Sequence, residues 1–119
     1  MAIRIAFIGL RHGHIKGLYK RLLERDDVVV AAACEEDAET RKGFEGSPFS
    51  ITHDSYPAML DEVDCDAIAC GDYYAIRGER LIQAMENGKH VVGDKPLCTS
   101  LEDLSRIAQL SQERGVSVG

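Results

Sequence analysis

A glycine turn near the amino terminus is the first place in this sequence where chemistry can be expected. An apolar run over residues 2–10 leads into the turn "GLRHGHIKG", which begins at Gly9. Where such a turn joins a strand to a helix, the first amide groups of the helix are unpaired and attract phosphate. Four basic side chains in the turn add positive charge there: Arg11, His12, His14 and Lys16. The turn therefore predicts a pyrophosphate site.

The glycine spacing of this turn departs from the usual dinucleotide fingerprint, which has glycines at its first, third and sixth positions. Gly9 fits the first position, but Arg11 and His14 occupy the other two and Gly13 stands one place early. We predict that the pyrophosphate contacts come from Gly9, Arg11, His12, Gly13 and His14. The alternative is a structural turn surrounded by solvated basic side chains. With no acidic residue or cysteine beside them, the two histidines do not predict a metal site.

Glu35 is a second candidate, because it directly follows the apolar run "VVVAAAC" over residues 28–34. A carboxylate at the end of a second strand can accept hydrogen bonds from the ribose hydroxyls of an adenosine. It would also repel a 2'-phosphate, so NAD is favoured as cofactor and NADP is the alternative. The other interpretation is that Glu35, together with Glu36 and Asp37, only lies near the positive end of the next helix.

The elements that would position these residues alternate along the whole chain. Short apolar runs are separated by amphipathic helical patterns, and they cover residues 2–10, 28–34, 49–52, 66–71, 90–93 and 116–118. Parallel neighbouring strands need helical crossovers. We therefore predict an α/β fold of the Rossmann type, a doubly wound parallel sheet of about six strands with helices on both faces. Residues 1–119 are enough for one such domain.

The composition narrows the class of protein. The net charge is −6, with basic residues concentrated in 1–25 and acidic residues in 26–72, which argues against general nucleic-acid binding. There is no apolar run of membrane-spanning length and no secretory signal, so we expect a soluble, cytoplasmic protein that does not bind a membrane. The four cysteines form no CxxC pair, which fits a reducing compartment and not a zinc site.

The stretch "HVVGDKPLCTS" (90–100) places an acid, a lysine and a proline directly after a strand-like run. The longer segment "AMENGKHVVGDKPLCTSLEDLSRIAQLSQERGVSV" resembles the Gfo/Idh/MocA family of glucose-fructose oxidoreductases, inositol dehydrogenases and rhizopine catabolism proteins. Members of that family carry a Gly-Lys-His-Val run followed by Glu-Lys-Pro. The order of elements is similar to the nucleotide-binding domain of the family over essentially the whole chain.

The resemblance implies roles for the residues that follow the later strands. Lys95 would orient the substrate hydroxyl near the nicotinamide ribose and assist proton transfer, since a partly desolvated ammonium group can donate to a reacting oxygen. Pro96 would hold the turn that directs Lys95, and Asp94 replaces the more common glutamate. Gly71 and Asp72 would contact the edge of the cofactor. The alternative is that Lys95 is merely a surface residue after a strand.

Other positions depart from the family pattern. After the fourth predicted strand the family often has Pro-Asn and then a histidine, whereas this chain has Tyr73, Tyr74 and Arg77. Either tyrosine could stack on the cofactor or could simply pack against the fold. Together with Arg11 and His14 in the turn, these differences indicate an atypical branch of the family.

The function that the resemblance implies is hydride transfer between NAD and a sugar, polyol or related hydroxy compound, with the cofactor supplying the redox chemistry. By the same resemblance, we expect the family's second domain, which binds substrate and makes oligomer contacts, to lie outside these 119 residues. We therefore expect the chain alone to be inactive and the full-length protein to be a homo-oligomer. A non-catalytic Rossmann protein that senses a dinucleotide or a partner is the alternative. A receiver-like domain is disfavoured, because the first strand is not followed by paired acids.

Overall fold

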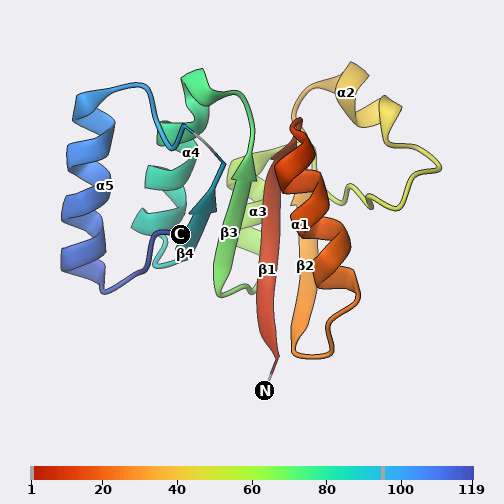
Figure 1. Cartoon of the computed structure of the whole chain (residues 1–119), viewed down its shortest axis with the longest axis horizontal. Coiled ribbons are helices and arrows are strands. Elements are labelled where there is room, and N and C mark those ends of the chain that lie inside the picture. Colours follow the sequence, from red (N-terminus) through yellow and green to blue (C-terminus); the bar gives the residue numbers. More distant parts are fainter. Residues whose placement is uncertain (1, 95) are drawn as a thin grey trace.

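The computed structural model describes residues 2–94 and 96–119, which form a parallel sheet flanked by helices (Figure 1). The strands are β1 (Ile3–Leu10), β2 (Val28–Cys34), β3 (Ala67–Gly71) and β4 (His90–Gly93). The helices are α1 (Gly13–Leu23), α2 (Ala38–Gly43), α3 (Tyr56–Glu62), α4 (Tyr74–Glu86) and α5 (Leu101–Arg114). The strands lie in the order β2-β1-β3-β4, and each neighbouring pair is parallel. The predicted fold class is confirmed.

The sheet has fewer regular strands than the six that the apolar runs predicted. Within the described residues, the runs 49–52 and 116–118 leave only isolated bridges, from His53 to Cys34 and from Val118 to Val91. Beside β2 the side chain of Thr52 intervenes, because its hydroxyl oxygen accepts a hydrogen bond from the Ala33 amide at 3.1 Å. A side chain thus takes a place that a backbone carbonyl would fill in a regular ladder, and the strand does not extend.

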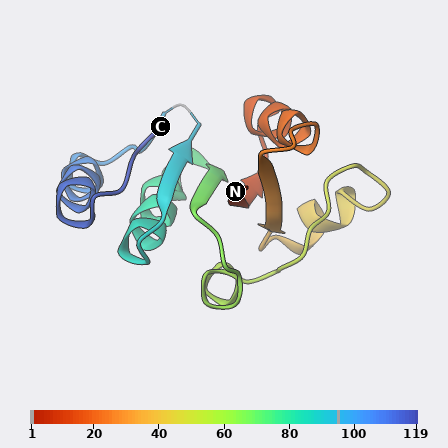
Figure 2. The same ribbon diagram turned by 90° about the horizontal axis from the view of Figure 1, so that it is seen from below.

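Helices cover both faces of the sheet, as expected. Figure 2 shows α1 on one side, α3 and α4 on the opposite side, and α5 beyond α4. The residues of β1 alternate accordingly: Ala6 and Ile8 belong to the core formed with α3, α4 and α5, whereas Phe7 belongs to the core formed with α1. Complete burial of a large apolar side chain contributes about 1.5–3 kcal/mol. Two apolar layers therefore hold β1 in the centre of the sheet.

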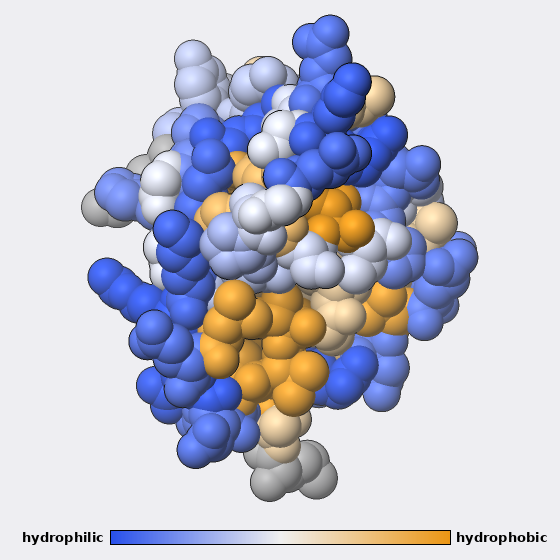
Figure 3. Space-filling model, turned by 90° about the vertical axis from the view of Figure 1, so that its right-hand side faces the viewer, coloured by the Kyte–Doolittle hydropathy of each residue, from blue (hydrophilic) through white to orange (hydrophobic). Residues whose placement is uncertain are grey.

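The edge strand β2 lies on the side that Figure 3 shows, where apolar residues reach the surface. Three apolar side chains from β1, α1 and β2 are exposed: Ile3, Leu23 and Val29. No helix among the described residues has the length and apolar character needed to cross a membrane.

The core also determines which thiols can react. Burial raises the pKa of Cys34 to about 12 and that of Cys70 to about 11, and it raises the pKa of Cys65 as well. Cys98 is partly exposed. Because the thiolate is the nucleophile, we expect iodoacetamide at pH 8 to modify Cys98 first and the other three only after unfolding in urea. Mass spectrometry of timed samples checks this order, and equally rapid labelling of Cys70 in the folded protein would contradict it.

Candidate functional site

The carboxyl ends of the parallel strands meet at one edge of the sheet, and most of the predicted site residues lie there. Gly9 is near the end of β1, Glu35 follows β2, Asp72 follows β3 and Asp94 follows β4. Ligands of open parallel sheets bind at this edge. The structure therefore brings these predicted residues to one edge of the sheet, and their roles in binding stay predictions.

Two glycines allow the backbone to close tightly around this edge. Gly9 has a φ of +72°, and a Cβ added to it would lie 2.7 Å from the backbone of Asp72. A Cβ on Gly71 would lie 2.2 Å from the Ile15 side chain of α1. A side chain at Gly9 or Gly71 would therefore push apart the elements that form the turn. By contrast, a Cβ on Gly13, the first residue of α1, would meet no heavy atom within 4 Å.

The start of α1 is open, as a phosphate site requires. His12 is the N-cap residue, makes no side-chain capping bond, and has a buried Nε2 without a hydrogen-bond partner. A pocket of about 310 Å³ lies here, lined by His12, Gly13, His14 and Asp94. The first amides of a helix have no partners within it, and they carry partial positive charge. Together with the open space at Gly13, these groups fit the pyrophosphate of a dinucleotide.

His14 and Asp94 face each other across this pocket. The Nδ1 atom of His14 is 3.5 Å from Oδ1 of Asp94, and the histidine side chain is 90% exposed whereas the aspartate side chain is 9% exposed. The two predicted residues are therefore brought together, although they come from α1 and from the end of β4. Pro96 is exposed, and Lys95 lies outside the described residues.

Arg11 takes a direction that the sequence did not predict. Its Nη2 donates to Glu35 Oε2 at 2.8 Å, and its Nε donates to Asp72 Oδ1 at 2.9 Å. Its Nη1 donates to the Tyr73 hydroxyl at 3.0 Å and to Thr40 Oγ1 at 3.2 Å. The guanidinium carbon also lies 4.1 Å from the centre of the Tyr73 ring. The guanidinium is thus held between strand ends, and its predicted pyrophosphate contact stays a prediction.

Glu35 is almost completely buried, with 1% of its surface exposed. Its Oε2 accepts from Arg11 and also from the Asp37 amide at 3.0 Å, whereas its Oε1 is buried without a hydrogen-bond partner. Burial raises the pKa of Glu35, although the Asp37 amide and the Arg11 charge act in the opposite direction. The predicted ribose acceptor is therefore at the expected strand end but is covered by Arg11.

A second arginine, not predicted from the sequence, extends this chain of charges. Arg80 of α4 forms a close ion pair with Glu36, and its Nε lies 3.4 Å from Asp72 Oδ2. Burial opposes ionisation of Glu36, but the Tyr56 amide and Arg80 outweigh it and lower the pKa of Glu36. Positive and negative side chains consequently alternate across the ends of β2, β1 and β3.

Arg77 is a third arginine, which the sequence had marked only as a departure from the family pattern. It is 0% exposed, and its Nη1 donates to the carbonyl oxygens of Asp94 at 2.8 Å and Pro96 at 2.6 Å. Its Nη2 donates to the Asp72 carbonyl at 2.8 Å. It therefore fastens the turn after β4 to the end of β3. The sequence did contain a signal for this burial, because Arg77 lies on the same helical face of α4 as the apolar residues Leu81 and Ala84.

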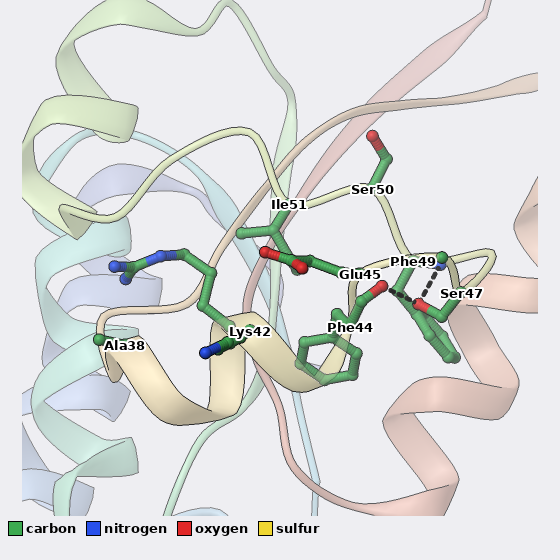
Figure 4. A pocket seen from close by; sticks show the side chains of 10 residues that line it. Ala38, Lys42, Phe44, Glu45, Ser47, Phe49, Ser50 and Ile51 are labelled. Carbon is green, nitrogen blue, oxygen red and sulfur yellow. Dashed lines mark hydrogen bonds between the residues drawn. The ribbon is translucent and has the colours of Figure 1, made fainter.

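A wider pocket of about 630 Å³ lies between α2 and the following loop (Figure 4). Phe44 and Phe49 line it, and Ser47 bonds to the backbone of both, so the loop is held by its own contacts. None of the predicted site residues that the structure describes lines this pocket. It is consequently not part of the site at the strand ends.

Comparison with curated proteins finds sugar and polyol enzymes. The chain is 29% identical over 118 residues to "Inositol 2-dehydrogenase 3" of Saccharopolyspora erythraea, covering 97% of this chain and 34% of that protein. It is 33% identical over 73 residues to the "dTDP-3,4-didehydro-2,6-dideoxy-alpha-D-glucose 3-reductase" of Actinomadura kijaniata, covering 61% and 21% of the two chains.

Solved structures with the same fold include a dehydrogenase from Chromobacterium violaceum, with a TM-score of 0.81, 28% identity, and coverage of 99% of this chain and 35% of that one. The WlbA dehydrogenase of Bordetella pertussis, solved with NADH and UDP-GlcNAcA, has a TM-score of 0.83 at 22% identity, with 99% and 36% coverage. The chain thus spans about a third of the length of these two proteins and of the inositol dehydrogenase.

The family model described as "Oxidoreductase family, NAD-binding Rossmann fold" matches residues 3–119, which is nearly the whole chain. This match agrees with the parallel sheet, the glycine turn and the Lys-Pro segment after β4. The resemblance inferred from the sequence is confirmed, and the chain belongs to the Gfo/Idh/MocA family of NAD-binding oxidoreductases.

Proposed function

We propose that this chain is the dinucleotide-binding domain of an oxidoreductase that moves a hydride between NAD and a hydroxyl-bearing carbon of a sugar, polyol or related compound. The observation that carries this proposal is the open start of α1, where an added Cβ on Gly13 meets no atom and a pocket of about 310 Å³ lies. This arrangement offers unpaired amides to a pyrophosphate and leaves space for it. The named activities of the inositol dehydrogenase and the sugar reductase support the substrate class.

The residues divide into four groups along the proposed binding path. The pyrophosphate lies at the start of α1, against Gly9, His12, Gly13 and His14. The adenosine ribose lies toward Glu35, and the nicotinamide end lies toward Gly71, Asp72 and Asp94. By the family resemblance, Lys95 with the adjacent Pro96 is the group that acts on the substrate. Bound NAD supplies the hydride acceptor, and these residues supply orientation and charge. A cytoplasmic location and a homo-oligomeric full-length protein stay predictions.

Gly13→Asp tests the pyrophosphate site. The new carboxylate meets open space, so it causes no clash, and a negative charge in the first turn favours the helix itself. It repels a pyrophosphate, and we expect calorimetric titration to show about tenfold or more weaker NADH binding, since tenfold corresponds to about 1.4 kcal/mol. Gly13→Asn is the matched neutral control and is expected to bind within about threefold of the unchanged chain. Equal NADH affinity of the two variants would place the pyrophosphate elsewhere.

A non-catalytic dinucleotide-sensing or partner-binding protein is a second candidate. One observation favours it: Arg11 forms an ion pair with Glu35, the carboxylate that was expected to bind the ribose. If the folded chain binds none of NAD, NADH, NADP or NADPH at millimolar concentration, this second candidate becomes the better account of the chain, and titration of the full-length protein follows.

A further inference from the structure

Arg11 stands where the dinucleotide fingerprint has its second glycine, and its side chain reaches the end of the neighbouring strand. It pairs with Glu35 at 2.8 Å and with Asp72 at 2.9 Å. We propose that Arg11 determines the choice between NAD and its 2'-phosphorylated form, because it neutralises the carboxylate that would otherwise exclude the phosphate. This inference rests on the proposed function and adds a specificity-determining residue to that site.

The charge at the ribose position decides which cofactor is tolerated. An unpaired Glu35 carboxylate would accept ribose hydroxyls and repel a 2'-phosphate. In this structure its Oε2 is bound by Arg11 and by the Asp37 amide, and the side chain is covered. An approaching phosphate therefore meets a guanidinium before it meets the carboxylate. The repulsion that the sequence alone predicted for Glu35 is therefore reduced, although Arg11 is shared with Asp72.

The guanidinium is held in this position by more than Glu35. Asp72, Thr40 and the Tyr73 hydroxyl accept its other hydrogen bonds, and its plane lies over the Tyr73 ring. Its side chain retains 12% exposure. Arginine suits this position because its planar fork can bind a carboxylate on one side and phosphate oxygens on another. The cation consequently stays in place when a ligand approaches.

Glu35 Oε1 independently indicates that Glu35 would select NAD if Arg11 were removed. It is buried without a hydrogen-bond partner among the described residues. A carboxylate oxygen of this kind normally has a donor when buried. Without Arg11 the carboxylate becomes accessible, and both its oxygens can accept from the two ribose hydroxyls. Arg11 therefore weakens the selection of NAD and allows both cofactors to bind.

The test is a set of titrations with NADH and NADPH, with the ratio of the two dissociation constants as readout. We expect a ratio within about tenfold of one for the unchanged chain. Arg11→Ala is expected to raise the NADPH-to-NADH ratio of dissociation constants by about tenfold or more, because like charges are then opposed. Glu35→Gln, and the double variant Arg11→Ala with Glu35→Gln, are expected to keep the ratio low. Arg21→Ala, an exposed change on α1, is the control for loss of a positive charge.

The outcomes separate this inference from the proposed function. Suppose that both cofactors bind but Arg11→Ala leaves the ratio of dissociation constants unchanged, or changes it as much in the Glu35→Gln background as in the unchanged chain. The role of Arg11 is then overturned, and the proposed function stands. If the unchanged, folded chain binds neither cofactor, both are overturned. Arg11→Met keeps the apolar stem and serves if Arg11→Ala unfolds, which a thermal melt of each variant shows.

Discussion

Replacing Arg77 with methionine is expected to destabilise the fold by about 3 kcal/mol and to release the turn after β4. The guanidinium is completely buried, and its described hydrogen bonds go to the carbonyls of Asp72, Asp94 and Pro96. Methionine fills a similar volume but donates no hydrogen bond, so these carbonyls lose their charged donor. Relief of the buried charge offsets part of the loss, which limits the net effect.

Urea denaturation measures the free-energy loss, and hydrogen exchange of the Leu97 and Cys98 amides reports on the turn itself. Arg21→Met, on the exposed surface of α1, is the matched control and is expected to change stability by less than about 0.5 kcal/mol. Arg77→His introduces the residue that the family often has there and is expected to be intermediate, because imidazole has at most two donors. A loss below about 1 kcal/mol for Arg77→Met would show that the carbonyls do not depend on this side chain.

The first two strands could be predicted from the sequence, because a long apolar run flanked by charged residues is typical of a buried strand. The runs 2–10 and 28–34 correspond closely to Ile3–Leu10 and Val28–Cys34. The run 49–52 was wrong as a regular strand, because its contact with β2 is limited to a few backbone bonds at Thr52 and His53 and to the Thr52 hydroxyl, which bonds to the backbone of Ala33. A short apolar run carries no information about such a contact.

The location of the candidate site followed from the fold, but its internal contacts did not. Glu35 and Asp72 could be placed at strand ends by counting elements along the chain. Arg11 was expected to face a pyrophosphate, whereas it bonds to Asp72, which is 61 residues away, and to Glu35, which is 24 residues away. The direction of a long charged side chain depends on which partners the folded chain presents, and the sequence offered several acids of equal suitability.

Gly9→Ala is expected to cost about 3–4 kcal/mol, the second large effect among these substitutions. Two separate costs contribute. A φ of +72° is unfavourable for alanine by about 1–2 kcal/mol, and the added Cβ would lie 2.7 Å from the backbone of Asp72. Backbone cannot rotate away as a flexible side chain can, so β1 and the end of β3 must separate. We therefore also expect NADH binding to be lost, since the turn and Asp72 shape the same edge.

Gly88→Ala separates these two costs, because Gly88 has a nearly equal φ of +75° and no heavy atom within 4 Å of an added Cβ. It therefore carries the conformational cost alone, about 1–2 kcal/mol. Urea denaturation of both variants gives the difference, which we expect to be about 2 kcal/mol and to represent the approach of Gly9 to Asp72. Equal losses would mean that the turn relaxes at little cost, and the close approach of Gly9 to Asp72 would then not explain the glycine at the start of the turn between β1 and α1.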